Sequence, residues 1–181
     1  NITAGKVTIS DGTTIQNAKT SGDGASAVAI SGGTLDLNAE DSGKVVTIAG
    51  NESTGAGAAV KIADGFVQTD TPVTINGNVQ INNNTMSSGK GNVYLGKTSL
   101  YVKKGNTFTG NISVSVPNDR TPTNNDDGTP IVDFAGRTPT SIIPYSTSNF
   151  GSDKNGQTVE QADTSKNSKN GGAQQTGILY L

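Results

Sequence analysis

The chain has 181 residues and contains neither cysteine nor histidine. Without cysteine the chain has no disulfide framework, and its composition does not indicate whether it belongs to an oxidising or a reducing compartment. Without histidine the chain lacks the commonest general base and the usual protein ligand of catalytic zinc. We therefore expect no metal centre, no cofactor and no catalytic site of the familiar histidine-dependent kinds.

Apolar residues and net charge are also scarce. The hydrophobic fraction is 31%, well below the ~45–50% of an ordinary globular domain. The net charge is only −2, whereas disordered chains combine low hydrophobicity with high charge. With 24 glycines, the composition favours a solenoid of short strands, which buries few side chains and bonds its backbone between repeats.

The low net charge and the short apolar runs also exclude some kinds of partner. A near-neutral chain lacks the basic stripe of a nucleic-acid binder, so no nucleic acid is expected. No apolar run reaches the roughly 18–20 residues that a membrane-spanning helix needs, so no membrane insertion is expected. The chain shows no signal peptide and no initiating methionine, which indicates a mature or excised piece.

A repeat is the strongest positive feature. Apolar residues fall into three columns: Ile15, Ile48 and Ile81; Val28, Val60 and Val93; Leu35, Val67 and Leu100. The first column steps by 33 residues twice, and the other two step by 32 and then 33. A constant period at several apolar positions is the signature of a repeat architecture.

Short alternating runs such as Val7–Ile9, Val28–Ile30 and Val60–Ile62 predict strands, and Gly-containing pairs between them predict turns. An antiparallel sandwich would show no fixed long period. We therefore predict an all-β, single-domain parallel β-helix (β-solenoid) with about 33-residue coils of three or four short strands. Ser42 falls where an apolar residue is expected, so the middle repeat should lack a strand or hold a wider turn.

Alternation along each strand divides the side chains between inside and outside. Val28, Ile30, Leu35 and Leu37 should point into a narrow core. Two columns should point outward, namely Ala29–Lys61–Tyr94 and Asp36–Gln68–Tyr101.

Asparagine recurs near one corner of the predicted coil. Asn17, Asn51 and Asn84 lie two or three residues beyond the aligned isoleucines. Asparagine tolerates left-handed backbone and bonds neighbouring amides, so these residues are interpreted as a structural ladder.

Regularity ends after Val116. Residues 1–116 are predicted to form the regular coils, and residues 117–181 an irregular C-terminal end of the same solenoid, with final rungs and polar loops. A separate C-terminal domain is disfavoured because few apolar residues remain to build its core.

The motifs Ala58–Ile62, Ser31–Leu35, Gly91–Leu95 and Asn111–Val114 resemble right-handed parallel β-helix repeats of the bacterial adhesin-like cell-surface type. The resemblance is close over Ile2–Val116 and looser beyond. It implies an extracellular, cell-surface location and a stalk or adhesive task, but it carries no catalytic motif.

Candidate chemistry is sparse. The densest carboxylates on the regular coils are Asp36, Glu40, Asp41 and Glu52, and no second acidic column stacks on them. Paired carboxylates for cleaving a polysaccharide are therefore not evident, although a lyase or hydrolase remains the alternative function. Asn124–Gly128 and Asp153–Gly156 resemble parts of calcium loops but lack the distal glutamate, which favours plain turns.

Exposed aromatic residues supply the one binding hypothesis. Tyr94 and Tyr101 should face outward near Lys97 and Lys103, where they could contact a glycan or a protein. Covering the flank of the coil is the competing interpretation. The sequence thus predicts a non-catalytic structural or adhesive module whose partner is a glycan, a host or neighbour-cell surface protein, or copies of itself joined end to end.

Overall fold

The computed structural model is nearly all β, with 47% strand and 4% helix, as the sequence predicted. It describes residues 1–22, 27–41, 43–67, 70–103, 108–121, 127–134, 147–168, 174 and 178–181. The helical residues among them form two short 3-10 turns, η1 (Asn118–Arg120) and η2 (Thr147–Asn149). No helix in these ranges is long and apolar enough to cross a membrane.

Consecutive strands form windings, each of which pairs in parallel with the next. The first winding comprises β1 (Lys6–Ser10), β2 (Thr14–Gln16), β3 (Lys19–Thr20) and β4 (Val28–Ile30). The second comprises β5 (Thr34–Ala39), β6 (Val46–Ala49), β7 (Glu52–Ser53) and β8 (Val60–Ile62). The third comprises β9 (Val73–Gly77), β10 (Val79–Asn82), β11 (Thr85–Met86), β12 (Gly89–Lys90) and β13 (Val93–Tyr94).

Later windings are shorter. The fourth comprises β14 (Leu100–Val102) and β15 (Asn111–Ser115), and the fifth β17 (Pro130–Phe134) and β18 (Phe150–Ser152). The remaining strands are β16 (Asp127–Gly128), β19 (Glu160–Gln161), β20 (Asn167–Ser168) and β21 (Ile178–Tyr180).

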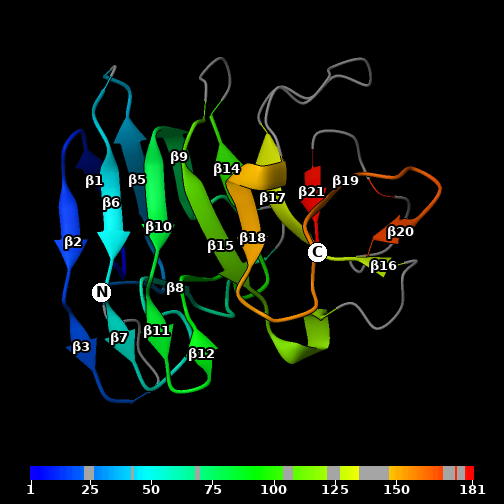
Figure 1. Cartoon of the computed structure of the whole chain (residues 1–181), viewed down its shortest axis with the longest axis horizontal. Coiled ribbons are helices and arrows are strands. Elements are labelled where there is room, and N and C mark those ends of the chain that lie inside the picture. The colour runs from blue at the N-terminus through cyan, green and yellow to red at the C-terminus, as the bar shows by residue number, and fades with distance from the viewer. Residues whose placement is uncertain are drawn as a thin grey trace.

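Equivalent strands of successive windings build the sheets. One has the order β1-β5-β9-β14-β17-β21-β19, and a second has the order β2-β6-β10-β15-β13-β8-β4, with β18 added beside β15. Strands β12-β11-β7-β3 form a four-stranded lobe, and β16 pairs with β20. Figure 1 shows the windings following one another along the longest axis, so the arrangement is partly solenoid-like.

The first predicted column is confirmed. Ile15 pairs with Ile48, and Ile48 pairs with Ile81 in the parallel register. The column continues through Ile112 to Phe150. It therefore crosses five windings, and a long-range apolar stack of this kind stabilises each winding only through its neighbours.

The second predicted column is also confirmed, because Val28 pairs with Val60 and Val60 with Val93. Its next member is Val114 on β15. Strand β15 also carries Ile112 of the first column, so one strand of the fourth winding contributes to both columns. In the third winding, the β11–β12 hairpin lies between the two columns. The fourth winding therefore adds no strand to the four-stranded lobe, and we call this change between the third and fourth windings the step.

The third predicted column is wrong at its middle member. Leu35 pairs with Val73, and Val67 is 55% exposed. The second winding ends at Ile62 and β9 begins only at Val73, with a turn in which the Val67 amide donates to Asp70 Oδ2 at 2.8 Å. A constant period places Val67 in the column because it ignores this longer connection. Thr74, rather than Gln68, lies between Asp36 and Tyr101; Gln68 is outside the described residues.

Of the two explanations for the irregular middle repeat, the missing strand is wrong and the wider turn is confirmed, because six residues separate β5 from β6 whereas three separate β1 from β2. Leu37 lies between Ile9 and Ile75 in the parallel register, so the second winding supplies its own apolar residue at this position. Ser42, which the constant period placed there, lies outside the described residues. The windings keep their strands in register while their connections differ in length.

One continuous apolar core runs through the windings, from Ile2 to Leu179. Three of the four residues expected to point inward, Ile30, Leu35 and Leu37, are buried, and Val28 is half-buried against the core. Burial of each such side chain is worth about 1.5–3 kcal/mol. Because each rung contributes only a few of them, stability depends on stacking.

The two ends of the stack differ. Strands β1, β2 and β3 are the outermost members of their sheets at the N-terminal end, and Val7 on β1 is 42% exposed. At the C-terminal end β21 pairs antiparallel with both β17 and β19, which interrupts the parallel ladder. Parallel pairing nevertheless continues past Val116, through β14 with β17 and β15 with β18.

Arg120 joins η1 to this C-terminal part. Its guanidinium donates to the carbonyl oxygens of Gly96 at 2.7 Å, Thr98 at 3.0 Å and Pro130 at 3.1 Å. Burial lowers the pKa of Arg120, and electrostatic interactions with Asp119 and Tyr94 oppose that shift. The guanidinium nevertheless stays charged at neutral pH, and the three carbonyls compensate for its burial.

Candidate functional site

A buried ladder of amide side chains crosses the lobe. The Asn51 side-chain amide donates to Asn84 Oδ1 at 2.8 Å, and the Asn51 backbone amide donates to the same oxygen at 3.0 Å. Asn84 Nδ2 in turn donates to Asn92 Oδ1 at 2.9 Å. Each asparagine side chain thus donates a hydrogen bond to the next residue along the stack, and these bonds satisfy polar groups that are shielded from water.

The ladder ends on a carboxylate. Asn92 donates through its backbone amide to Asp153 Oδ2 at 2.7 Å and through Nδ2 to Asp153 Oδ1 at 2.8 Å. The Ser113 hydroxyl donates to Asp153 Oδ1 at 2.6 Å. Asp153 is 8% exposed, so these donors replace most of the water that a carboxylate would otherwise bind.

Of the three asparagines predicted as a ladder, the structure brings Asn51 and Asn84 together and places Asn17 elsewhere. Ala18 occupies the ladder position in the first winding, and its amide donates to Asn51 Oδ1 at 3.0 Å. Asn17 is exposed and has φ 61°, and the corresponding corner residues are Gly50 at 66° and Asn83 at 55°. Asn17 therefore serves the left-handed corner, a conformation that asparagine and glycine tolerate best.

Sequence reasoning missed Asn92 and Asp153 as members of the ladder. Asn92 comes after the β11–β12 hairpin, only eight positions from Asn84, and so falls outside the repeat period. Asp153 follows β18, in the part of the chain beyond the regular repeat. The one available signal was the spacing: Asn51 and Asn84 lie three residues beyond the aligned isoleucine, whereas Asn17 lies two beyond it.

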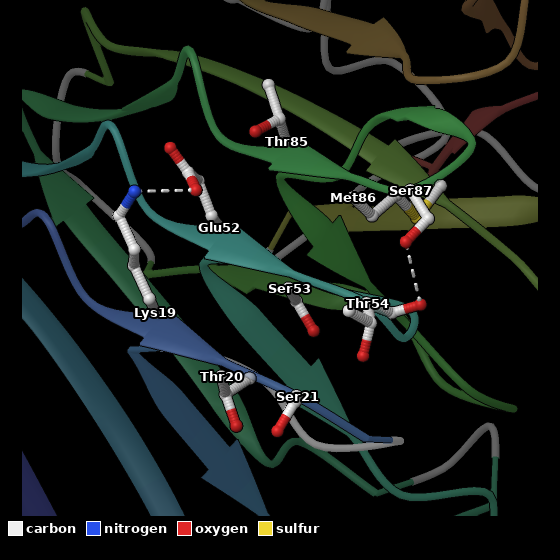
Figure 2. Close-up of a pocket in the computed structure, with 9 residues that line it drawn as sticks. All are labelled: Lys19, Thr20, Ser21, Glu52, Ser53, Thr54, Thr85, Met86 and Ser87. Atoms are coloured by element: carbon white, nitrogen blue, oxygen red, sulfur yellow. Dashed lines mark hydrogen bonds and ion pairs between the residues drawn. The ribbon is translucent and has the colours of Figure 1, made fainter.

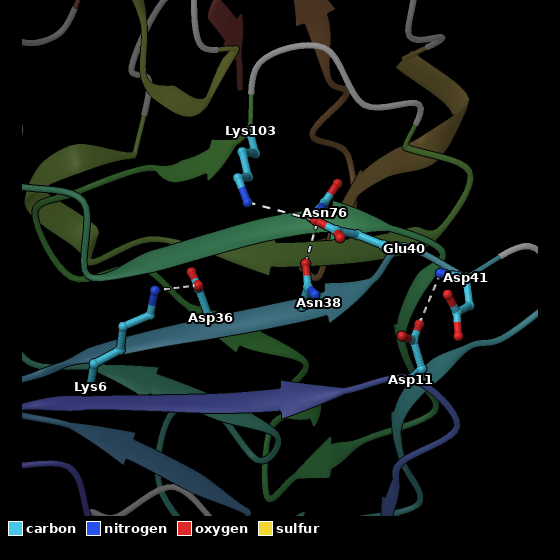
Figure 3. A network of polar contacts seen from close by, with 8 residues as sticks. All are labelled: Lys6, Asp11, Asp36, Asn38, Glu40, Asp41, Asn76 and Lys103. Carbon is cyan, nitrogen blue, oxygen red and sulfur yellow. Dashed lines mark hydrogen bonds and ion pairs between the residues drawn. The ribbon is translucent and has the colours of Figure 1, made fainter.

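A second polar network covers the outer face of β1, β5, β9 and the end of β14 (Figure 3). Lys6 Nζ lies 2.6 Å from Asp36 Oδ2, and Lys103 Nζ lies 3.6 Å from Glu40 Oε1. Asn76 Nδ2 donates to Asn38 Oδ1 at 2.8 Å and also to Glu40 Oε1. The contacts link side chains of different windings, so they reinforce the parallel register.

The four acidic residues singled out in the sequence make different contacts. Asp36 and Glu40 belong to the network just described, and Glu52 Oε2 lies 2.9 Å from Lys19 Nζ. The Asp41 backbone amide donates to Asp11 Oδ1 at 3.2 Å. Within the described ranges, no group of three Asp, Glu, His or Cys side chains is arranged to hold a metal ion.

The tyrosines of the binding hypothesis lie on different sheets. Tyr94 is on β13 of the eight-stranded sheet and Tyr101 on β14 of the seven-stranded sheet, and both are half-buried. The Tyr94 hydroxyl donates to Asp64 Oδ1 at 3.4 Å. Lys97 is exposed, and Lys103 is engaged by Glu40. No single sheet face therefore gathers these four residues.

An open groove of about 590 Å³ lies over the lobe. Figure 2 shows its lining, to which each of the strands β3, β7 and β11 contributes its two residues and the residue that follows: Lys19, Thr20, Ser21, Glu52, Ser53, Thr54, Thr85, Met86 and Ser87. Thr54 Oγ1 accepts from the Gly22 amide at 2.6 Å, and Ser87 Oγ donates to the Thr54 carbonyl at 3.4 Å. Hydroxyls and one ion pair can hydrogen-bond a polar ligand, but these nine residues supply no ring for stacking.

The calcium-like motifs have separate outcomes. Asp153 turns its carboxylate inward to Asn92 and Ser113, and Gly156 has φ 81°, which fits the turn that follows. Most of the other motif, residues 124–126, lies outside the described residues.

A scan against protein-family models and searches of curated proteins and of solved structures found no match to this chain.

Proposed function

We propose that this chain is a non-catalytic structural and adhesive module of a bacterial cell-surface protein, folded as a right-handed parallel β-helix with an irregular C-terminal end. The observation that carries the proposal is the five-member apolar column from Ile15 to Phe150, in which residues of successive windings stack in register. A parallel ladder along the stack resists extension because each winding is hydrogen-bonded to the next.

The right-handed winding rests on two arguments. The repeats resemble right-handed β-helix repeats, and connections between parallel strands of one sheet are right-handed in about 98% of cases. A crystal structure with left-handed windings, or with antiparallel hairpins in place of the stack, would overturn the fold proposal.

The use of the carboxylates supports a non-catalytic role. Asp36, Glu40 and Glu52 form ion pairs across windings, and Asp153 ends the buried ladder. These groups stabilise the register rather than face one another across a cleft, as the paired acids of a glycosidase do. The chain serves as a stiff spacer whose outward columns contact a glycan, a host or neighbour-cell protein, or another copy at the exposed N-terminal rung.

Two measurements test the proposal. Antibodies against the chain should label intact, unpermeabilised cells that produce it, and labelling confined to lysed cells would refute the extracellular location. Incubation with acidic and neutral polysaccharides should release neither reducing nor unsaturated ends, because either product would show the alternative lyase or hydrolase activity.

A further inference from the structure

The step between the third and fourth windings creates a second cavity beside the groove over the lobe, and Met86 lines both. The β11–β12 hairpin has no counterpart in the fourth winding, because β15 passes directly from the Ile81 column to the Val93 column. The hairpin therefore overhangs the step and faces η1 and the turn after β18. The resulting pocket has a volume of about 520 Å³.

Two lysines from different elements line this pocket. Lys90 is on β12 of the hairpin, and Lys154 is in the turn that follows β18. Both are exposed, and within the described part of the chain neither side chain makes an ion pair or hydrogen bond. Elsewhere Lys6, Lys19, Lys103 and Lys166 are each paired with a carboxylate. The pocket thus gathers two unneutralised ammonium groups.

Asp153, the one carboxylate among the described lining residues, does not offset both lysines. Asp153 is turned to the buried ladder, where Asn92 and Ser113 occupy its two oxygens. Two ammonium groups against one inward-facing carboxylate leave the opening positive, which favours an anionic ligand.

The remaining lining indicates which anion. Hydroxyl and amide side chains surround the lysines, namely Ser88, Asn118, Thr121, Asn155 and Gln157. They can hydrogen-bond several ring hydroxyls, and a cavity of about 520 Å³ is far larger than a single compact oxyanion needs. Among the described residues of the lining there is no arginine, the residue that most often forks onto phosphate. The chemistry matches a sugar that carries a carboxylate.

We propose that this pocket binds a uronic-acid unit of an acidic polysaccharide, with Lys90 and Lys154 engaging its carboxylate and the hydroxyl and amide groups engaging its ring hydroxyls. The assignment rests on the proposed adhesive role and names its ligand class. It also explains why the chain departs from its regular repeat at this place, since the shortened fourth winding makes the cavity.

Titration of the whole chain, followed by NMR, tests the assignment with D-glucuronate, D-glucose and inorganic phosphate as probes. Glucuronate should shift the resonances of the pocket, and glucose and phosphate should each bind at least about tenfold more weakly. Lys90→Gln and Lys154→Gln should each weaken glucuronate binding about fivefold, the size of one exposed ion pair of about 1 kcal/mol. Lys44→Gln is the matched control, because Lys44 is an exposed lysine remote from the pocket lining, and it should leave binding unchanged.

Equal binding of phosphate and glucuronate would reduce the pocket to a general oxyanion site and overturn the assignment. Equal binding of glucose, absence of glucuronate binding, or full binding by the double lysine variant would overturn it as well. These results are separable from failure of the proposed function, because surface labelling and the absence of polysaccharide cleavage are measured without this ligand.

Discussion

Asn84 sits one winding above Asn51 and accepts two hydrogen bonds from it at a single side-chain oxygen, 33 residues further along the chain. The two amides are buried, so each depends on the other for the bonds that water would otherwise make. This pair ties the register of the lobe to that of the sheets.

Asn84→Asp should destabilise the fold by about 3 kcal/mol, because it removes the donor to Ile48 O at 2.9 Å and Asn92 Oδ1 at 2.9 Å and buries a charge. Asn83→Asp is the neighbouring control: Asn83 is exposed with φ 55°, which aspartate tolerates. Urea unfolding measures both, and equal losses would show that the amide ladder contributes nothing specific.

Gly77→Ala should lower the free energy of unfolding by about 3 kcal/mol or more. Gly77 has φ 73°, and a Cβ there would lie 1.7 Å from the Ala39 carbonyl oxygen on the adjacent winding. Gly156→Ala tests backbone strain without a steric clash, because Gly156 has φ 81° but no atom within 4 Å of an added Cβ. This variant should lower the free energy of unfolding by about 1–2 kcal/mol. Similar thermal shifts for the two variants would contradict the close approach of the windings.

Val7→Lys should prevent association of copies through the exposed first rung. Val7 is 42% exposed on the outermost strand, and a lysine on a strand edge opposes strand addition. Val67→Lys is the control because Val67 is 55% exposed in a connection away from the edge. Sedimentation over a wide concentration range should show association of the parent and of Val67→Lys only, and a strictly monomeric parent would refute end-to-end assembly.

Ser165→Ala should raise the pKa of Asp163 toward its usual range. The Ser165 hydroxyl and backbone amide both donate to Asp163 Oδ1, which lowers the pKa of Asp163, and the variant removes the larger contribution. A carboxylate with a lowered folded pKa stabilises the fold above its unfolded pKa and loses that effect as the pH falls through the folded value. An NMR titration of Asp163 measures the change, and Thr164→Ala should not reproduce it.

Periodicity predicted the columns that step by 32 or 33 residues from one winding to the next. Ile15, Ile48 and Ile81 were recognisable because each step of this column contains one longer connection, β5–β6 in the first step and β8–β9 in the second, so the total stays the same. The column through Leu35 was misjudged, since the longer connection before Val73 shifts the register, and a fixed period cannot report such a change. The candidate binding residues Tyr94 and Tyr101 lie on two sheets. The sequence could not predict this, because a column of outward residues does not reveal to which sheet each residue belongs.

By itself the sequence determined an all-β chain of short strands, since sparse apolar residues that alternate locally and recur at long range can be buried only by stacking rungs. Tertiary structure alone decided where the stack is interrupted. The β11–β12 hairpin, the omission of the lobe from the fourth winding and the inward turn of Asp153 toward Asn92 all depend on contacts between residues without a periodic relationship. Local patterns cannot encode such contacts, because their energy appears only when distant segments meet.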